Sequence, residues 1–176
     1  IGDLQRAVEV LEKLREARGT ELSEDLEMRL AWLHSEVGNE EIALERWRNL
    51  WLRVNSIPRR RYVEDRMMSV ASRLGKLADI AIELEGRLFA GEADKRDSGL
   101  LVRLYTRVGD PVSATEIIEE FLKQAGGSEI VALEEKARVF MSCTDYHNYE
   151  RTIRSLIKIN PEGEGEYLQQ IAMSML

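Results

Sequence analysis

The sequence predicts an all-α fold of about ten helices, arranged as antiparallel hairpins that stack into an α-solenoid. Three observations predict it. Apolar residues recur at intervals of three and four along almost the whole chain, which is the spacing of an amphipathic helix. Short connectors such as "EVGN", "RLGK" and "RVGDP" interrupt this spacing, as they do in helix hairpins. The third observation is an internal repeat of about 35 residues, a period typical of solenoids.

A register of glycines carries the repeat. Gly2, Gly38, Gly75 and Gly109 are 36, 37 and 34 residues apart, and Thr144 takes the fifth place after 35 more. Gly at a hairpin turn tolerates the positive φ that ends a helix. Five positions further on come Ala7, Ala43, Ile80, Ala114 and Tyr149, and nine further on come Leu11, Trp47, Leu84, Ile118 and Ile153. A small residue after the turn lets two helices approach closely, while the larger residue fills the space beside it.

The register divides the chain into helices and their pairs. We expect a second helix alone in residues 1–20, complete hairpins in residues 24–57, 58–93, 94–128 and 129–162, and a first helix alone in residues 164–176. Asp110 is expected to cap the helix that follows it, with Pro111 at the first helical position, and Asp145 to cap a later one. Because both ends fall inside a repeat and the first residue is not Met, residues 1–176 are interpreted as a single solenoid segment of a longer array.

Composition limits the function classes. The chain has 176 residues, of which 44% are hydrophobic and 32% charged, as in an ordered domain. The formal net charge of -7 argues against binding to nucleic acid or an anionic membrane, which needs a basic face. No apolar run approaches the roughly 18 residues of a membrane helix, and we expect no membrane insertion. No signal peptide is apparent, and nothing in the segment predicts a cellular compartment.

The sequence offers little chemistry. His34 and His147 are far apart, and neither has a Cys or carboxylate at ligand spacing, so His34 is interpreted as a packed structural histidine. Cys143, the one cysteine, has no nearby His and is interpreted as a small buried residue rather than a nucleophile. The glycine-containing stretches lack the features of a phosphate loop. We therefore expect no enzyme activity, no catalytic residues, no metal site and no cofactor.

The same residues resemble a known family. Leu101-Val102-x2-Tyr105, followed by the Gly109 turn and Ala114, is similar to the tetratricopeptide repeat, whose signature runs W-x2-L-G-x2-Y, A-x3-F and P over 34 residues. The copies are degenerate: the signature Trp is missing, Ile80 and Tyr149 replace the small residue, and only Pro161 keeps the terminal proline. The resemblance implies a right-handed solenoid whose first helices line a concave groove, where partner peptides bind.

Family geometry places a set of side chains on this inner surface, most of them arginines. The set consists of Trp32, Arg66, Arg73, Arg96, Arg103, Arg107 and Arg138. The other inward side chains expected from this geometry are Met28, Ser35, Tyr62, Asp65, Ser69, Thr106, Glu134 and Met141. Arg suits bidentate recognition of carboxylates, so the expected partner is an acidic protein segment or a C-terminal carboxylate. The alternatives are partial burial of Trp32 against a neighbouring hairpin and pairing of the arginines with Asp and Glu of adjacent helices.

Two functions therefore compete. The first is a non-enzymatic protein–protein interaction scaffold that binds a partner segment in its groove. The second is a structural spacer, or a segment that self-associates through its exposed repeat ends. Binding of single-stranded RNA is a weaker third option, because helical-hairpin arrays also read RNA but this chain is acidic and lacks repeated base-reading polar pairs.

Overall fold

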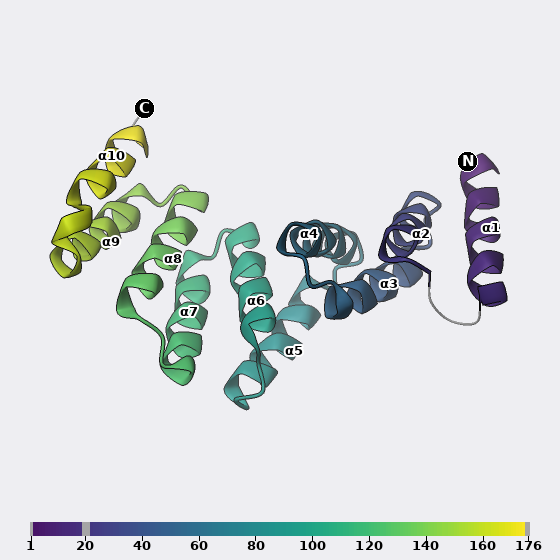
Figure 1. The fold of residues 1–176 in the computed structure, drawn as a ribbon, viewed down its shortest axis with the longest axis horizontal. Helices are drawn as coiled ribbons and strands as arrows, with labels where there is room; N and C mark the ends of the chain where they lie inside the picture. The colour runs from purple at the N-terminus through teal and green to yellow at the C-terminus, as the bar shows by residue number, and fades with distance from the viewer. Residues whose placement is uncertain (1, 19–21, 175–176) are drawn as a thin grey trace. The chain divides into compact units, whose positions relative to one another are not determined.

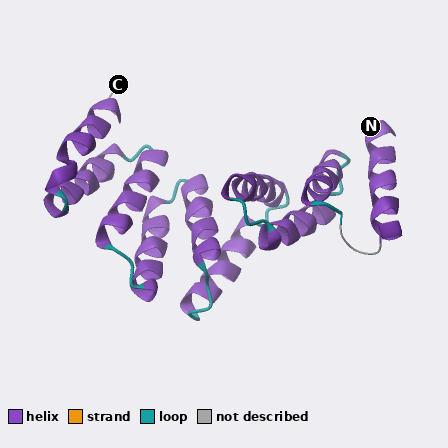
Figure 2. Cartoon of the chain, in the orientation of Figure 1, coloured by secondary structure: helices purple, strands orange, loops and turns teal. Residues whose placement is uncertain are grey.

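The structure is a computed structural model of the chain, and it describes residues 2–18 and 22–174. All regular secondary structure in these residues is helical (Figures 1 and 2), which confirms the predicted all-α fold. The ten α-helices are α1 (Gly2–Arg18), α2 (Glu24–Glu36), α3 (Glu40–Arg53), α4 (Ile57–Arg73), α5 (Leu77–Phe89), α6 (Lys95–Val108), α7 (Pro111–Ala125), α8 (Glu129–Ser142), α9 (Tyr146–Ile159) and α10 (Glu164–Ser174), with a 3-10 turn, η1 (Pro161–Gly163), before the last.

Gly2 begins α1, and the other residues of the glycine register lie in tight turns between helices. Gly38, Gly75 and Gly109 adopt φ values of 83°, 70° and 76°, in the left-handed region that L-residues with a side chain avoid. Thr144, at the fifth place of the register, adopts the same conformation with φ 57° and is the one non-glycine residue with positive φ in the described chain. The turn geometry is therefore retained where glycine is not.

Side-chain caps begin the helices after two of these turns. The Asp110 carboxylate accepts a hydrogen bond from the backbone N–H of Ser113 at 3.0 Å, and Pro111 occupies the first turn of α7. The Asp145 carboxylate accepts from the N–H of Asn148 at 3.2 Å and begins α9. Both predicted caps are confirmed. The side chain and backbone of Ser113 both donate hydrogen bonds to the ionised carboxylate of Asp110 and lower its pKa. Asn148 lowers the pKa of Asp145 in the same way.

The contacts divide the chain into two compact units, residues 1–78 and 79–176, and the boundary falls in the first turn of α5. In the first unit, α1 packs on α2, α2 on α3, and α3 on α4. Trp47 of α3 is fully buried, as its place in the register requires, and Trp51 of the same helix is nearly so. Leu30 and Leu33 of α2 form a cluster with Val8 of α1, and Trp51 Nε1 donates to Glu64 of α4 at 3.2 Å.

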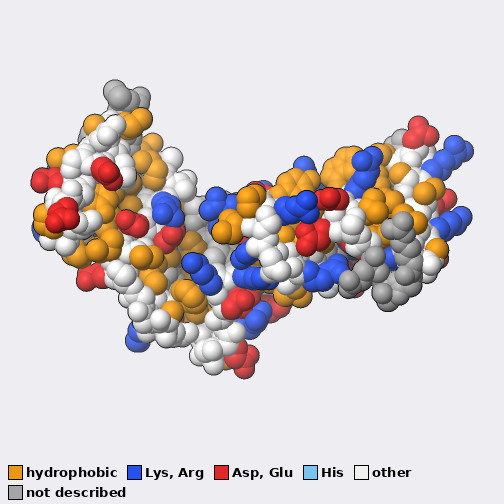
Figure 3. All heavy atoms as spheres, in the orientation of Figure 1, with side chains coloured by type: hydrophobic (Ala, Val, Ile, Leu, Met, Phe, Trp, Pro, Cys, Tyr) orange, Lys and Arg blue, Asp and Glu red, His pale blue; other side chains and the backbone are white. Residues whose placement is uncertain are grey.

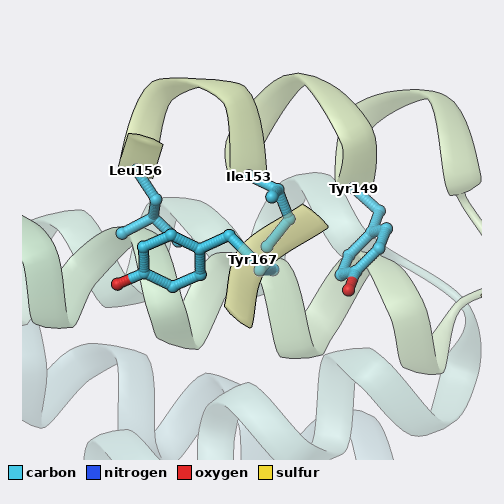
Figure 4. Packing of buried hydrophobic residues seen from close by; sticks show 5 residues of the cluster. Tyr149, Ile153, Leu156 and Tyr167 are labelled. Atoms are coloured by element: carbon cyan, nitrogen blue, oxygen red, sulfur yellow. The ribbon is translucent and has the colours of Figure 1, made fainter. Parts of the chain in front are cut away.

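In the second unit α6, α7, α8, α9 and α10 pack in sequence order. Ala114 and Ile118 of α7 pack against Val139 of α8, and the side chain of Gln124 on α7 donates to the carbonyl of Leu88 on α5 at 3.2 Å. The last core cluster is drawn in Figure 4. It consists of Ala137 from α8, Tyr149, Ile153 and Leu156 from α9, and Tyr167 from α10. No helix of the described chain is long and apolar enough to cross a bilayer.

Candidate functional site

The seven side chains expected on an inner surface are divided between the two units. Trp32, Arg66 and Arg73 lie in residues 1–78, on α2 and α4. The arginines of the second unit lie on α6 and α8; they are Arg96, Arg103, Arg107 and Arg138. Each unit is therefore considered by itself. Figure 3 shows basic and acidic side chains interspersed over the visible face rather than gathered by sign.

In the first unit these side chains interact with their own neighbours. Trp32 is half-buried and packs against the cluster formed by α1 and α2. The guanidinium of Arg66 lies over the ring of Tyr62, 5.2 Å from its centroid, in cation–π geometry. Arg73 pairs with Glu40 of α3 and donates to Ser69 Oγ at 3.3 Å. Contacts within the protein therefore engage both Arg66 and Arg73, the two α4 arginines that were expected on the inner surface.

The second unit brings α6 and α8 together. The thiol of Cys143, the residue that ends α8, donates to the carbonyl of Thr106 near the end of α6 at 3.7 Å. The C-terminal ends of these two helices are therefore adjacent. Arg107 is exposed beside Thr106, and no described residue lies within ion-pair distance of it. Arg103, about one turn before Arg107, and Arg96, about three turns before it, are half-buried and have interaction partners within the chain.

A hollow of about 470 Å³ opens between α8, α9 and α10. Its α8 wall holds the inward-facing residues expected from the sequence, Glu134, Arg138 and Met141, together with Ala137 and Ser142. The α9 and α10 walls are largely apolar and consist of Tyr149, Ile153, Leu156, Tyr167 and Gln170. The structure thus brings one predicted arginine and its two expected companions to a concave, mainly apolar surface.

Tyr167 is positioned in this hollow by the turn before α10. Its ring lies against Gly163, where an added Cβ would come within 2.7 Å of the ring atom Cε2 and the ring would have to shift. Its hydroxyl accepts a hydrogen bond from Asn160 Nδ2 at 3.4 Å. In Figure 4 the ring lies beside Ile153 and Leu156, with its hydroxyl directed away from Ile153. The hollow therefore has a fixed aromatic wall with a polar edge.

Charge at the hollow is balanced locally. The Arg138 side chain is 68% exposed and pairs with Glu135 at 2.6 Å, one turn earlier on the same helix. Such exposed i,i+3 pairs contribute little and exchange readily with other partners. Arg138 therefore remains available to a competing carboxylate, while the apolar walls would take an apolar side chain.

Residues with reactive side chains have structural roles. Burial, together with the charges of Asp110 and Asp145, raises the pKa of the Cys143 thiol, which disfavours the nucleophilic thiolate. Among the described residues no group of three or more His, Cys, Asp and Glu could hold a metal ion. Cys143 is half-buried rather than fully buried as the sequence suggested.

Sequence reasoning missed a buried charge network in the first unit. His34 Nε2 lies 3.0 Å from Glu12 Oε1, so this buried histidine does have a carboxylate partner, 22 residues away. Glu12 also pairs with Arg46 and, at 3.2 Å, with Arg15, while Arg46 lies 3.4 Å from Glu27. The network joins α1, α2 and α3. No spacing within one helix could signal it, because its members meet only when three helices pack.

Comparison with known proteins adds one structural likeness. No family model matches the chain, and neither does any curated protein. Among solved structures, the chain is similar to a tetratricopeptide repeat protein from Parabacteroides merdae ATCC 43184, with 19% sequence identity and a TM-score of 0.45. The similarity covers 99% of this chain and 70% of that one.

Proposed function

We propose that this chain is a non-enzymatic protein–protein interaction scaffold, and that its second unit binds a segment of a partner protein along the exposed sides of α6, α8 and α10. The observation that carries the proposal is the hollow between α8, α9 and α10. A concave surface with apolar walls and a few polar groups is the usual form of a binding site. Its α8 wall is also the helix face that the repeat register turns inward.

The partner segment is proposed to be acidic, with an apolar side chain at its centre. The apolar side chain would enter the hollow between Met141 and Tyr167. An acidic residue beside it would meet Arg107, because the C-terminal ends of α6 and α8 are adjacent. Arg138 would exchange Glu135 for a second carboxylate of the segment, a charge-assisted contact that Arg can make with two hydrogen bonds.

A second candidate function is a structural spacer or self-association segment. The pairing of Arg73 with Glu40 and of Arg138 with Glu135 favours it, because arginines already neutralised within the chain need no partner. In that case the exposed apolar side chains of α10, Leu168 at 48% and Met173 at 69%, would contact another copy.

A random peptide library displayed on phage and selected on the full chain tests the first proposal. We expect selected peptides to combine acidic residues with a large apolar one, and their Kd would be measured by fluorescence anisotropy. Arg103→Glu with Arg107→Glu should weaken binding about tenfold or more. Gln170→Trp, on the exposed rim of the hollow, should weaken it similarly by filling the space.

The matched control is Arg151→Glu with Arg154→Glu, two exposed arginines on α9 that do not line the hollow. It changes the net charge equally, and we expect it to leave peptide affinity nearly unchanged. If no peptide is enriched, or if the control weakens binding as much as the α6 variant, the groove proposal fails. Concentration-dependent association in sedimentation velocity would then favour the self-association alternative.

A further inference from the structure

A second hollow lies in the first unit, away from every side chain expected to bind a partner. It has a volume of about 390 Å³ and opens between α1, α2 and α3. It is lined by Arg15 of α1, Glu27 of α2, and Arg46, Asn49, Leu52 and Arg53 of α3. Since α1 and α3 are second helices of the repeat, this hollow does not belong to the proposed groove of first helices.

The lining is rich in hydrogen-bond donors. Arg46, Asn49 and Arg53 follow one another at intervals of three and four, so they share one face of α3. Arg15 faces them from α1, and the hollow therefore presents three guanidinium groups and one amide against a single carboxylate. Planar guanidinium groups bind oxyanions with two parallel hydrogen bonds each, which makes such a cluster suited to a phosphate.

All three arginines have partners within the protein. The Arg46 side chain is only 10% exposed; it pairs with Glu12 and lies 3.4 Å from Glu27. Arg46 is therefore ordered before a ligand binds and loses little conformational entropy. Arg15 forms an exposed i,i+3 pair with Glu12 at 3.2 Å, and Arg53 Nε donates to the carbonyl of Asn49 at 3.3 Å. The Nε of Arg46 is buried without a hydrogen-bond partner among the described residues. This side chain therefore has one N–H donor that no acceptor in the described chain satisfies.

Glu27 is the one lining group that opposes an anion. Its side chain is 9% exposed, and its carboxylate is already engaged by Arg46. Glu12, behind the lining, also pairs with Arg15 and Arg46, so three arginines stand against two glutamates and the formal charge of these five groups is +1.

We propose that this hollow binds a phosphate group, as a free phosphate or phosphomonoester or on a phosphorylated side chain of a partner. Its volume lies in the range of small-molecule sites and leaves room for what the phosphate is attached to. Arg15 and Arg53 contact the phosphate oxygens from opposite walls, and Arg46 provides a fixed charge at the floor. Asn49 donates to a remaining oxygen. The site does not depend on the proposed peptide groove.

Isothermal titration of the full chain with inorganic phosphate, and separately with N-acetyl-phosphoserine amide, tests the proposal. Sodium chloride would hold the ionic strength constant, because screening alone changes weak anion binding. We expect saturable binding of one ligand per chain. Arg15→Gln and Arg53→Gln should each weaken it about tenfold, and Glu27→Gln should tighten it by removing the opposing charge.

Arg61→Gln is the matched control, because Arg61 is an exposed arginine of the same unit on α4 and does not line the hollow. It should leave the affinity unchanged, and circular dichroism would verify that all variants keep their helices. Binding of both probes identifies a general phosphate site, whereas binding of the phosphoserine compound alone assigns the phosphate to a partner side chain. Binding of neither probe, or equal weakening by Arg61→Gln, overturns the proposal.

Discussion

Thr144 is the residue at which the sequence and its backbone conformation disagree most. It adopts a φ of 57°, whereas the equivalent turns use Gly38, Gly75 and Gly109. A β-branched side chain is unfavourable in this left-handed region, because Cβ crowds the neighbouring carbonyl. The hydroxyl of Thr144 donates to the carbonyl of Cys143 at 2.7 Å, a local bond that offsets only part of this cost.

Replacing Thr144 by glycine should therefore stabilise the protein. We expect Thr144→Gly to raise the free energy of unfolding by about 1 kcal/mol, since the relief of strain exceeds the added flexibility of the unfolded chain. Urea unfolding followed by circular dichroism measures the change. Gly109→Thr is the reciprocal variant and should destabilise by a similar amount. A neutral or destabilising Thr144→Gly would mean that the strain is absent.

Individual positions differed in how well the sequence predicted them. Ala114, Trp47 and Ile153 are buried as their register places require, because helical spacing decides which side of a helix meets its neighbour. Glu12 and His34 could not be paired in advance. The side-chain contact between them depends on the angle at which α1 docks on α2, and a spacing of 22 residues carries no such information.

At the scale of helices, Glu12 is the main polar connection between α1 and the hairpin of α2 and α3. Its carboxylate accepts from His34 and Arg46, which belong to the two helices of that hairpin. Burial raises the pKa of Glu12, but the hydrogen bond from His34 and the charges of Arg46 and Arg15 together outweigh it, so the pKa lies below its usual value of 4.5.

The direction of this shift predicts an acid-sensitive attachment of α1. Because the pKa is lower in the folded state, the stabilisation by Glu12 is present above the unfolded-state pKa and is lost as the pH falls below 4.5 through the folded pKa. Glu12→Ala should cost about 3 kcal/mol at neutral pH, since it removes the carboxylate partner of the buried His34 and leaves Arg46 with Glu27 alone. It should also reduce the slope of stability against pH below 4.5.

Urea titrations at several pH values, followed by tryptophan fluorescence, measure both effects. The matched control is Glu16→Ala, one turn further along α1, where the side chain is exposed. It should change the stability by less than about 0.5 kcal/mol. An unchanged pH slope in Glu12→Ala would assign the acid sensitivity of the first unit to other carboxylates.

Elements were more predictable than the sites between them. The starts of α7 and α9 followed from Asp110 and Asp145, because a cap is a local interaction that four consecutive residues decide. The ion pair of Arg73 with Glu40 joins residues 33 positions apart, and the sequence could offer it only as one alternative. Whether an arginine faces a partner or a neighbouring helix is decided by packing, and the local pattern is the same in both cases.

For the whole molecule, the division into two units changes the meaning of the net charge. Residues 1–78 contain 14 basic and 14 acidic side chains, whereas residues 79–176 contain 11 and 18, so the formal charge of -7 belongs to the second unit. The total argued only against wholesale binding of polyanions and left room for a local basic patch. The neutral first unit removes that objection for the phosphate-binding hollow between α1 and α3, while the acidic second unit limits the proposed peptide to one that its few arginines can hold.

The same division predicts how the chain unfolds. Contacts in helical repeats are formed between neighbours, so a chain with two compact groups of contacts can lose them in separate steps. All three tryptophans, Trp32, Trp47 and Trp51, belong to the first unit, and two of them are buried. Fluorescence therefore reports on that unit alone, whereas circular dichroism at 222 nm, a wavelength that averages over all helices, reports on both units.

We expect the two probes to give different urea midpoints and to respond to different substitutions. Glu12→Ala should lower the urea midpoint measured by fluorescence. Thr144→Gly should leave that midpoint unchanged and raise the midpoint of the second unit, which only dichroism detects. Both variants are measured in the full chain, so no isolated unit has to fold. If fluorescence and dichroism instead give the same midpoint, and each substitution shifts that midpoint in both measurements, the chain unfolds as one cooperative structure. In that case the strain at Thr144 also lowers the stability of the α1 attachment.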